Sequence, residues 1–174
     1  MADFEFKDHS LEVKAALNDE ALNWLRETAA EIASHAKENC TMTDDGGQLR
    51  KSYRFEVDDA NGKAYIGSSL ESSYWEEYGT GEYADTAKNG GKSGRQGWWI
   101  YTPGSDGPEG YQSRYYATKA EADEMAKYIK ATYKKTAVVT SGREAKYTLE
   151  NAFIAKGIPA ISTLKSDMKA RMNR

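Results

Sequence analysis

The apolar residues near the start of the chain recur at steps of three and four, which is the spacing of one helix face. From Ser10 to Asn39 this repeat is carried by Leu22, Leu25, Ala29, Ile32 and Ala36. No glycine or proline interrupts it, so the pattern predicts an amphipathic helix of about 45 Å, at about 1.5 Å per residue. Asn18 and Asp19 leave open a division of this helix into two pieces.

Two short stretches of alternating residues follow, at 53–57 and 63–68. The loop between them ends in Asn61-Gly62, a dipeptide typical of a tight hairpin turn. The sequence therefore predicts a β-hairpin. By the period of two, its inward face combines Tyr53, Phe55 and Val57 from the first strand with Ala64 and Ile66 from the second.

The middle of the chain is rich in glycine and aromatic residues. Gly97–Tyr101 has the composition of a third strand, which ends before Pro103-Gly104. The stretch Ala84–Gly97 before it has no apolar period and holds basic residues among Asn and Gly. Because such a stretch buries too little apolar surface to order itself, we expect a mobile loop there.

The last third of the chain is predicted to form a helix, a strand and a second helix. Thr118 and Glu121 have the spacing of a capping box, which predicts a helix over 118–133. Val138–Thr140 is a short strand candidate, and a last helix begins at Thr148. Gly157 and Pro159 predict a kink or restart in that helix, because proline lacks the helical N–H donor. We expect about 160–174 to be a helical tail.

Length and cysteine content limit the class of protein. A chain of 174 residues is normally one domain, so we expect a single domain over 1–174. Cys40 is the one cysteine, which excludes an internal disulfide and favours a reducing compartment. The N-terminus lacks the pattern of a signal peptide, and no apolar run approaches the length of a membrane span.

Charge is divided unevenly along the chain. The net charge is −3, from 24 Lys and Arg against 27 Asp and Glu. Residues 1–87 hold 8 basic and 19 acidic side chains, a net of −11. Residues 88–140 hold 9 and 5, and residues 141–174 hold 7 and 3, so that each stretch has a net charge of +4. This distribution favours complementary faces within one kind of subunit.

Catalytic chemistry has little support in the sequence. His9 and His35 have no second metal ligand at a recognisable spacing, and Cys40 reads as a packed apolar residue. Glu76 and Glu77 stand among aromatic residues, as carboxylates of a glycosidase do. On an extended segment they point to opposite faces, which disfavours the required pair, so we expect solvated acids there. The sequence predicts no enzyme, no metal and no cofactor.

Aromatic residues suggest two binding alternatives. Trp98-Trp99, near Lys92 and Arg95, resembles a stacking platform for single-stranded nucleic acid, but the negative net charge opposes a polyanion. We expect core or interface aromatics there instead. The alternative function is a small carbohydrate- or cell-wall-binding module, which requires exposed stacking surfaces from Trp75, Trp98, Trp99 and Tyr101.

Four motifs, in order, resemble the head–tail joining (neck or tail-completion) proteins of long-tailed bacteriophages. The first is the long N-terminal helix, and the others are the runs Asp45-Gly46-Gly47-Gln48-Leu49-Arg50-Lys51-Ser52, Tyr65-Ile66-Gly67-Ser68 with Glu77-Tyr78-Gly79-Thr80-Gly81, and Gly142 with Thr148-Leu149-Glu150-Asn151-Ala152-Phe153. The resemblance implies an α+β fold. In it, long N- and C-terminal helices pack on a small, mainly antiparallel sheet, and the helix around 118–133 lies in an insertion over about 104–137.

The same resemblance implies a virion structural protein of the neck. Such a protein forms an oligomeric ring that joins the DNA-filled head to the tail and through which DNA passes. Its implied partners are further copies of itself, portal-side adaptor or stopper proteins, and tail terminator or tail-tube proteins. DNA is only a non-specific cargo of the lumen, and no membrane is involved. Before assembly the protein is expected in the host cytoplasm, and afterwards in the virion.

The resemblance also selects residues. The motif positions that we expect to build the fold are Asp45, Gly47, Leu49, Arg50, Ser52, Gly67, Glu77, Tyr78, Gly79, Thr80, Gly142, Leu149 and Phe153. The candidate interface positions are Lys88, Lys92, Arg95, Trp98, Trp99, Lys165, Lys169 and Arg171.

Some of these positions have a physical role that the residue type suggests. We expect Gly47 to adopt a left-handed or tight backbone and Leu49 to fill the core. Arg50 is expected to pair with an acid such as Glu77. Gly79 and Gly81 are expected to turn the chain after a buried Tyr78. The segments 84–97 and 163–174 are expected to order on assembly.

Overall fold

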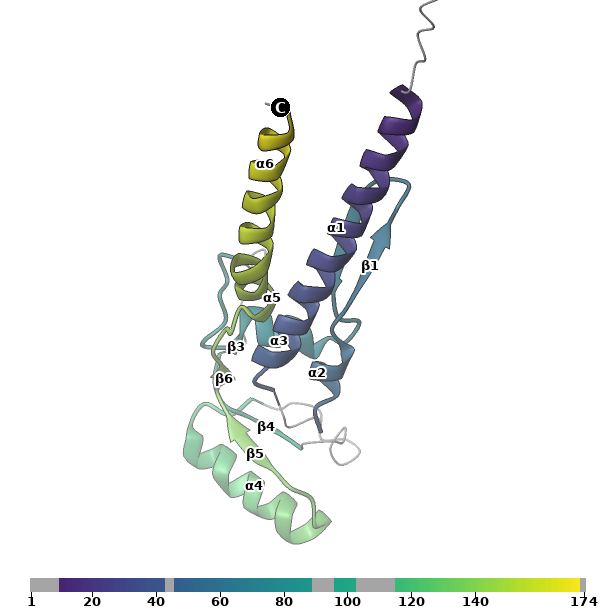
Figure 1. The fold of residues 1–174 in the computed structure, drawn as a ribbon. Helices are drawn as coiled ribbons and strands as arrows, with labels where there is room; N and C mark the ends of the chain where they lie inside the picture. Colours follow the sequence, from purple (N-terminus) through teal and green to yellow (C-terminus); the bar gives the residue numbers. More distant parts are fainter. Residues whose placement is uncertain (1–9, 43–45, 89–95, 103–114, 173–174) are drawn as a thin grey trace, which may run out of the picture.

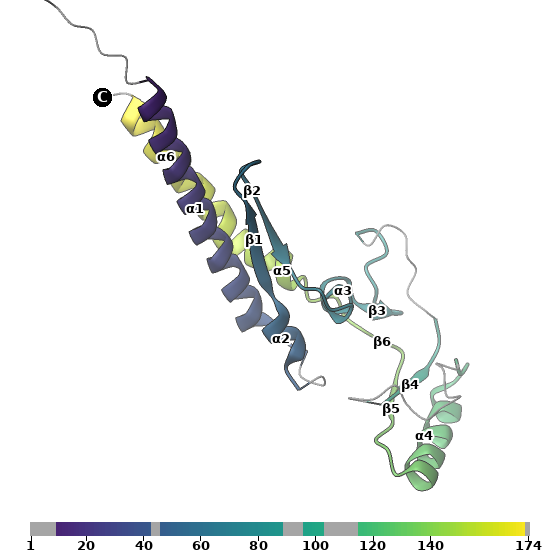
Figure 2. The ribbon, with the colours of Figure 1, turned by 90° about the vertical axis from the view of Figure 1, so that its right-hand side faces the viewer.

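Two long helical segments run beside each other at one end of the molecule, and a small helix-and-strand unit forms the other end (Figure 1). The computed structural model describes residues 10–42, 46–88, 96–102 and 115–172. The beginning of the first helix and the end of the last lie at the same end of the molecule, so these two helices are antiparallel (Figures 1 and 2).

The first element, α1, is one continuous helix over Ser10–Asn39. It passes through Asn18 and Asp19 without a break, because neither residue removes a helical donor as proline would. Its buried side includes Ala29, Ile32 and Ala36, three of the five residues of the predicted apolar face. The long helix and its inward face are therefore confirmed.

A short helix and the predicted hairpin follow. The helix α2 covers Gln48–Ser52, and the strands β1 (Arg54–Asp58) and β2 (Lys63–Gly67) pair antiparallel. The Asp58 side chain accepts hydrogen bonds from the Asn61 backbone N–H at 3.1 Å and from its Nδ2 at 2.7 Å, which tightens the turn. Both strands contact α1.

The register of the hairpin matches the predicted face. Phe55 lies opposite Ile66, and Val57 lies opposite Ala64. Tyr53, just before β1, is fully buried, whereas Phe55 is 39% exposed. The two strands therefore contribute the predicted residues to one face of the hairpin, but part of that face is exposed to solvent.

The segment after the hairpin forms a helix, α3, over Ser72–Tyr78. It is followed by the two-residue strand β3 (Thr80–Gly81), which pairs with β6 (Gly142–Arg143). Gly142, predicted to be a turn, is thus part of a short strand. This pair joins segments that are about sixty residues apart in sequence.

The unit at the far end consists of one helix and one strand pair. Strand β4 (Trp99–Tyr101) pairs with β5 (Val138–Thr140), and α4 (Lys119–Tyr133) packs against both. The capping box of Thr118 and Glu121 is present with both of its hydrogen bonds, so the start of this helix is as predicted.

The C-terminal helical segment contains a π-helical turn. It consists of α5 (Thr148–Ala152), the π-helix η1 (Phe153–Gly157) and α6 (Ile158–Met172). The predicted kink or restart at Gly157 and Pro159 takes the form of this wider turn, and the helix continues beyond it. A Cβ on Gly157 would lie 2.7 Å from the Phe153 ring and 3.3 Å from Cδ1 of Ile32, so the absence of a side chain allows the close approach to α1.

The described residues form two separate clusters of buried apolar side chains. The larger cluster joins Ile32 and Ala36 of α1, with Cys40 just after it, to Leu49, Tyr53 and Ala152. The smaller cluster joins Ala126 and Ile129 of α4 to Ala137. Cys40 is 2% exposed, as expected for a packed apolar residue.

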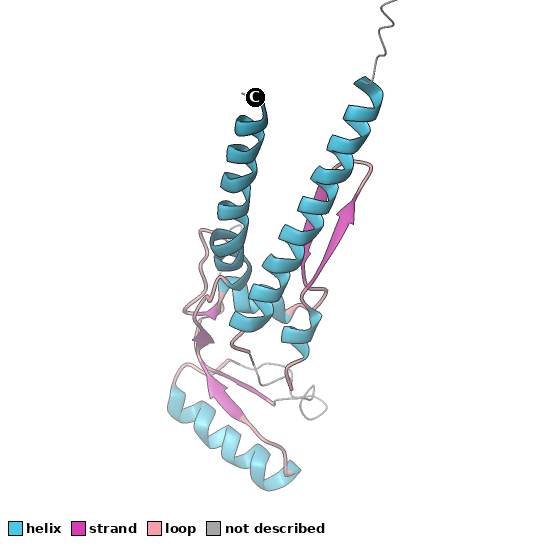
Figure 3. Cartoon of the chain, in the orientation of Figure 1, coloured by secondary structure: helices cyan, strands magenta, loops and turns pink. Residues whose placement is uncertain are grey.

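The α+β fold with long N- and C-terminal helices is confirmed (Figure 3). Within the described residues, the strands form three separate two-stranded antiparallel pairs. No helix in this part of the chain is both long enough and apolar enough to cross a membrane.

Gly81 and Gly62 provide a matched test of how closely β3 and β6 approach each other. Both have a left-handed φ, +63° and +60°, but a Cβ on Gly81 would meet the Ser141 carbonyl oxygen, while a Cβ on Gly62 meets nothing within 4 Å. We expect Gly62→Ala to lower the free energy of unfolding by about 1 kcal/mol through backbone strain. Gly81→Ala should lower it by about 3 kcal/mol or more, because strain and overlap combine.

Urea unfolding followed by circular dichroism measures both losses. Equal losses in the two variants would contradict the close approach of β3 and β6.

Candidate functional site

Two adjacent carboxylates on α3 are buried, which is unusual for acidic side chains. Glu76 is 0% exposed and Glu77 is 7% exposed. The expectation that these acids are solvated is therefore wrong. It assumed an extended segment, whereas a helix placed beside the core directs both side chains toward other elements.

The carboxylate of Glu76 joins the end of α1 to β6. Its Oε1 accepts hydrogen bonds from the Thr41 backbone N–H at 2.7 Å and from Thr41 Oγ1 at 2.9 Å. Its Oε2 lies 2.9 Å from Nη2 of Arg143, which also donates to Thr41 Oγ1 at 2.9 Å. The Thr148 hydroxyl lies 3.4 Å from Oε1. A buried carboxylate is tolerated because it is paired and hydrogen-bonded in this way.

The carboxylate of Glu77 caps the start of α5. Tyr147, at the N-cap position, has a left-handed φ of 51° and makes no side-chain capping bond. The two oxygens of Glu77 instead accept hydrogen bonds from the backbone N–H groups of Leu149 at 2.7 Å and Glu150 at 2.9 Å. A carboxylate from another helix thus satisfies the free N–H donors of the first turn and complements the helix dipole.

Backbone contacts strengthen the same junction. The N–H of Lys146 donates to the Glu76 carbonyl at 2.9 Å, and the N–H of Tyr147 donates to the Glu77 carbonyl at 3.2 Å. We refer to Glu76, Glu77, Thr41, Arg143 and Thr148 as the carboxylate cluster. It holds α1, α3, β6 and α5 together, so the role that its geometry supports is structural.

The predicted pairing of Arg50 with Glu77 is wrong. Nη2 of Arg50 donates to the Cys40 carbonyl at 3.0 Å, at the end of α1. Glu77 is occupied by two backbone donors, and Arg143, from a distant part of the chain, supplies the cation for Glu76.

A second network ties the segment after β3 to α5. The Tyr147 hydroxyl donates to Asp85 at 2.6 Å, and Nζ of Lys88 lies 2.6 Å from Oε2 of Glu150 and 4.5 Å from the centre of the Tyr147 ring. Lys88, a candidate interface residue, is thus engaged within its own chain. Most of the predicted mobile loop, 89–95, with Lys92 and Arg95, lies outside the described residues.

The motif Asp45–Ser52 contributes to the larger core. Leu49 is fully buried and Gly47 has a left-handed φ of 78°, both as predicted. The Ser52 hydroxyl donates to the Leu49 carbonyl at 2.7 Å and lies 2.5 Å from the Ser68 hydroxyl. Since Ser68 directly follows Gly67, the last residue of β2, this contact links α2 to the end of the hairpin. Asp45 lies outside the described part of the chain.

The later motifs form the junction around α3. Gly79 and Gly81 have left-handed φ values of 72° and 63°, so the sharp turn is as predicted, although Tyr78 is only partly buried. The Thr80 hydroxyl accepts a hydrogen bond from the Arg143 N–H at 3.1 Å. Phe153, at 45%, is exposed and begins the π-helical turn.

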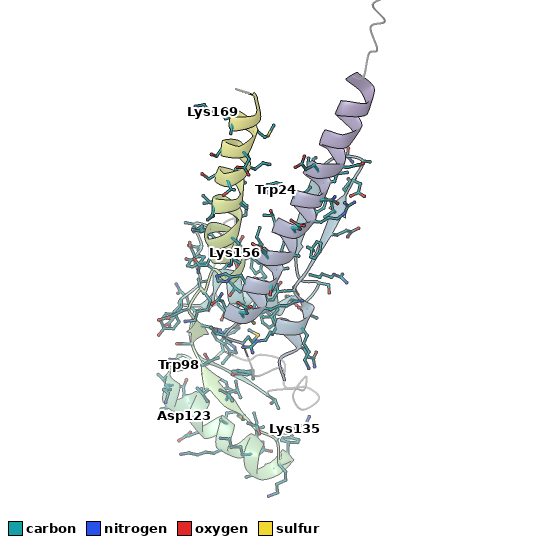
Figure 4. The ribbon with its side chains drawn as sticks, viewed as in Figure 1. Trp24, Trp98, Asp123, Lys135, Lys156 and Lys169 are labelled. Atoms are coloured by element: carbon teal, nitrogen blue, oxygen red, sulfur yellow. The ribbon has the colours of Figure 1, made fainter. Side chains whose placement is uncertain are left out.

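The aromatic residues do not form one surface. Trp75 lies on α3 and is 42% exposed, while Trp99 and Tyr101 lie on β4, in the other unit. Trp98 lies beside α4 (Figure 4), and its ring is 5.9 Å from Nζ of Lys119. Trp99 stacks edge-on with Tyr115, with ring centres 6.1 Å apart. The geometry therefore gives no support to a shared stacking platform.

The part of the chain that the structure describes contains no candidate metal-binding site. No group of three or more His, Cys, Asp or Glu side chains there lies in a position to hold an ion. Nδ1 of His35 lies 3.9 Å from Oε2 of Glu38 on the same helix. His9 is not among the described residues.

The sequence alone does not indicate that Thr41, Arg143 and Thr148 belong to one cluster. They come from three segments, and Arg143 stands 67 positions after Glu76. One sequence feature could have indicated the burial of the two acids. The run that they form with Trp75 and Tyr78 is compatible with a helix as well as with a strand.

The Glu76–Arg143 pair can be tested by a double-mutant cycle. Arg143→Met leaves a fully buried carboxylate without its cation, and we expect a loss of about 2 kcal/mol or more in the free energy of unfolding. Adding Glu76→Gln should recover part of that loss, because it removes the unpaired charge. Additive losses, measured by urea unfolding, would contradict the coupling.

Lys146 provides the control for this cycle. It forms an exposed ion pair with Glu144 at 3.3 Å. Lys146→Met should therefore cost less than about 1 kcal/mol.

The second network predicts a pH dependence. The hydrogen bond from Tyr147, followed by those from the Lys88 and Ala87 N–H groups, lowers the pKa of Asp85 below its usual value. A lowered folded-state pKa stabilises the protein at pH values above the unfolded-state pKa, about 4, and this stabilisation is lost as the pH falls through the folded-state pKa.

Tyr147→Phe should raise the folded-state pKa of Asp85 and make the loss of stability in acid smaller. NMR titration of the carboxylate, with the exposed Tyr83→Phe as control, measures the shift. An unchanged titration of Asp85 in Tyr147→Phe would contradict the assignment.

One comparison with known proteins supports the coarser part of the resemblance inferred from the motifs, a structural protein of a phage tail. Residues 4–79 match the model of a family described as "Bacteriophage HK97-gp10, putative tail-component". The match covers α1, α2, the hairpin and α3, and so includes both carboxylates. The comparison with curated proteins finds no match, and neither does the comparison with solved structures. Residues 4–79, which are less than half of the chain, are thus similar to a family of phage tail components.

Proposed function

We propose that this protein is a virion structural protein of the phage neck, where it joins the DNA-filled head to the tail as part of an oligomeric ring. The observation that carries the proposal is the family match over 4–79, which covers α1, the hairpin and α3. These elements supply most of the larger core, so the match concerns the centre of the fold and not a peripheral segment.

The distribution of charge supports assembly from identical copies. The first 87 residues have a net charge of −11, and each of the two later stretches has a net charge of +4. A ring needs a heterologous interface, in which one surface of a copy meets a different surface of the next. Opposite charges on different parts of one subunit favour such pairing and disfavour contacts between like surfaces.

The shape of the molecule suits contacts with different neighbours at its two ends. The free ends of α1 and α6 lie at one end, and α4 with β4 and β5 lies at the other (Figure 2). The second end exposes Tyr128 by 52% and Tyr133 by 44%, and exposed aromatic residues are common in protein interfaces. The partners proposed are portal-side adaptor or stopper proteins on one side and tail terminator or tail-tube proteins on the other.

DNA is proposed only as cargo that passes through the ring. A wall with net negative charge does not hold phosphates, so it permits transit. Before assembly the protein would reside in the host cytoplasm, and after assembly in the virion.

Removal of the gene from its phage or prophage tests this function. We expect full heads and separate tails to accumulate, because the neck contact is lost, and electron microscopy of the particles measures this. A copy supplied in trans should restore joined particles, and labelled protein should lie at the head–tail junction. Normal infectious particles without the protein would contradict the proposal.

A further inference from the structure

We propose that α6 of one copy docks on an acidic stripe along α1 of a second copy, in a head-to-tail contact. The inference rests on the ring assembly proposed above, and it names the two surfaces that form the contact.

The first surface is α6, which projects from the body of the molecule. None of its described side chains, 158–170, is buried. The contacts that hold the C-terminal segment against α1 are concentrated in α5 and η1. We refer to α6 as the arm. Apolar side chains are exposed to solvent at its beginning, where Ile158 is 51% exposed, and near its end, where Met168 is 53% exposed. A helix with open apolar side chains and few contacts to its own domain is suited to bind another surface.

Two of the three cations of α6, Lys165 and Lys169, lie on one face. Ile158, Lys165 and Lys169 stand at steps of seven and four, which places them in line on a helix. Both lysines are exposed, and Lys169 lies near the free end of α6 (Figure 4). Asp167, the one acid of α6, falls on the opposite face, about 160° from Lys165 at about 100° per residue.

The second surface is an acidic stripe on α1. The stripe consists of Glu20, Glu27, Glu31 and Glu38, which are separated by seven, four and seven positions and therefore lie in line. All four are exposed. By helical spacing, Arg26 and Lys37 lie about 100° or more away from this line. Glu27 and Glu31 are one turn apart, as are Lys165 and Lys169, so the two pairs match in spacing.

The arm cannot reach the stripe of its own chain. Its base is fixed where Gly157 packs near Ile32, on the buried face of α1. The stripe lies on the opposite face of α1, since Glu27 and Ile32 differ by about 140° in direction and Glu38 and Ala36 by about 160°. The arm and the stripe therefore face different ways, and their contact requires a second copy.

The chemistry favours a second copy over nucleic acid. A polyanion gains nothing from Ile158 and Met168, whereas an amphipathic protein surface does. The stripe repels phosphates and attracts cationic protein surfaces. Because the two surfaces differ and belong to the same chain, repeated contacts produce either a closed ring or an open filament.

A charge exchange tests the contact. Sedimentation velocity at low salt measures self-association of the full chain, with circular dichroism to verify helix content. Lys165→Glu with Lys169→Glu should weaken self-association by about tenfold or more, and Glu27→Lys with Glu31→Lys should do the same. The variant with all four changes should regain it, because each acidic arm then meets a basic stripe.

Lys127→Glu with Lys130→Glu provides the matched control. These residues are exposed on α4 and change the net charge by the same amount, so self-association should stay as in the wild type.

Three results would overturn the inference: a wild-type chain that stays monomeric at its highest soluble concentration, equal weakening by the α4 control, or no recovery in the four-residue variant. Each of these leaves the localisation of the protein at the neck untouched. Conversely, rescue by charge exchange in a protein that is absent from the neck would sustain the contact and contradict the proposed function.

Discussion

The folded chain depends on the neutralisation of two negative charges inside the protein. Glu76 and Glu77 stand side by side on α3, yet each satisfies a different set of donors. Glu76 takes its partners from Thr41, two residues after α1, and from β6, and Glu77 takes two backbone N–H groups in the first turn of α5. If either set of partners moved away, a carboxylate would remain buried without compensation, at a cost of several kcal/mol.

This constraint explains why such a small amount of β-structure is sufficient. β3 and β6 are only two residues each, and a ladder of that length contributes few hydrogen bonds. Their alignment is fixed by Arg143, whose side chain pairs with Glu76 and whose N–H donates to Thr80. The cluster therefore orients the chain as it passes from the larger core to the smaller one.

Local sequence patterns predicted the helices and strands correctly more often than they predicted the contacts between them. The long helix, the hairpin turn and the capping box each depend on residues within a few positions of one another, and all were recovered. The burial of Glu76 was not predicted, because its partners stand at positions 41, 143 and 148 and no local period connects them. Arg50 was assigned the wrong partner for the same reason. The family match likewise ends at residue 79, before Arg143 and Thr148.

The π-helical turn at Phe153–Gly157 has a consequence for how the arm is aimed. An α-helix turns by about 100° for each residue, so one residue added or removed there swings everything beyond it by that angle. The composition of α6 would be unchanged, but its lysines would face another direction. A single-residue change at the base of the arm is thus a route by which related proteins could exchange one neighbour for another while keeping the same body.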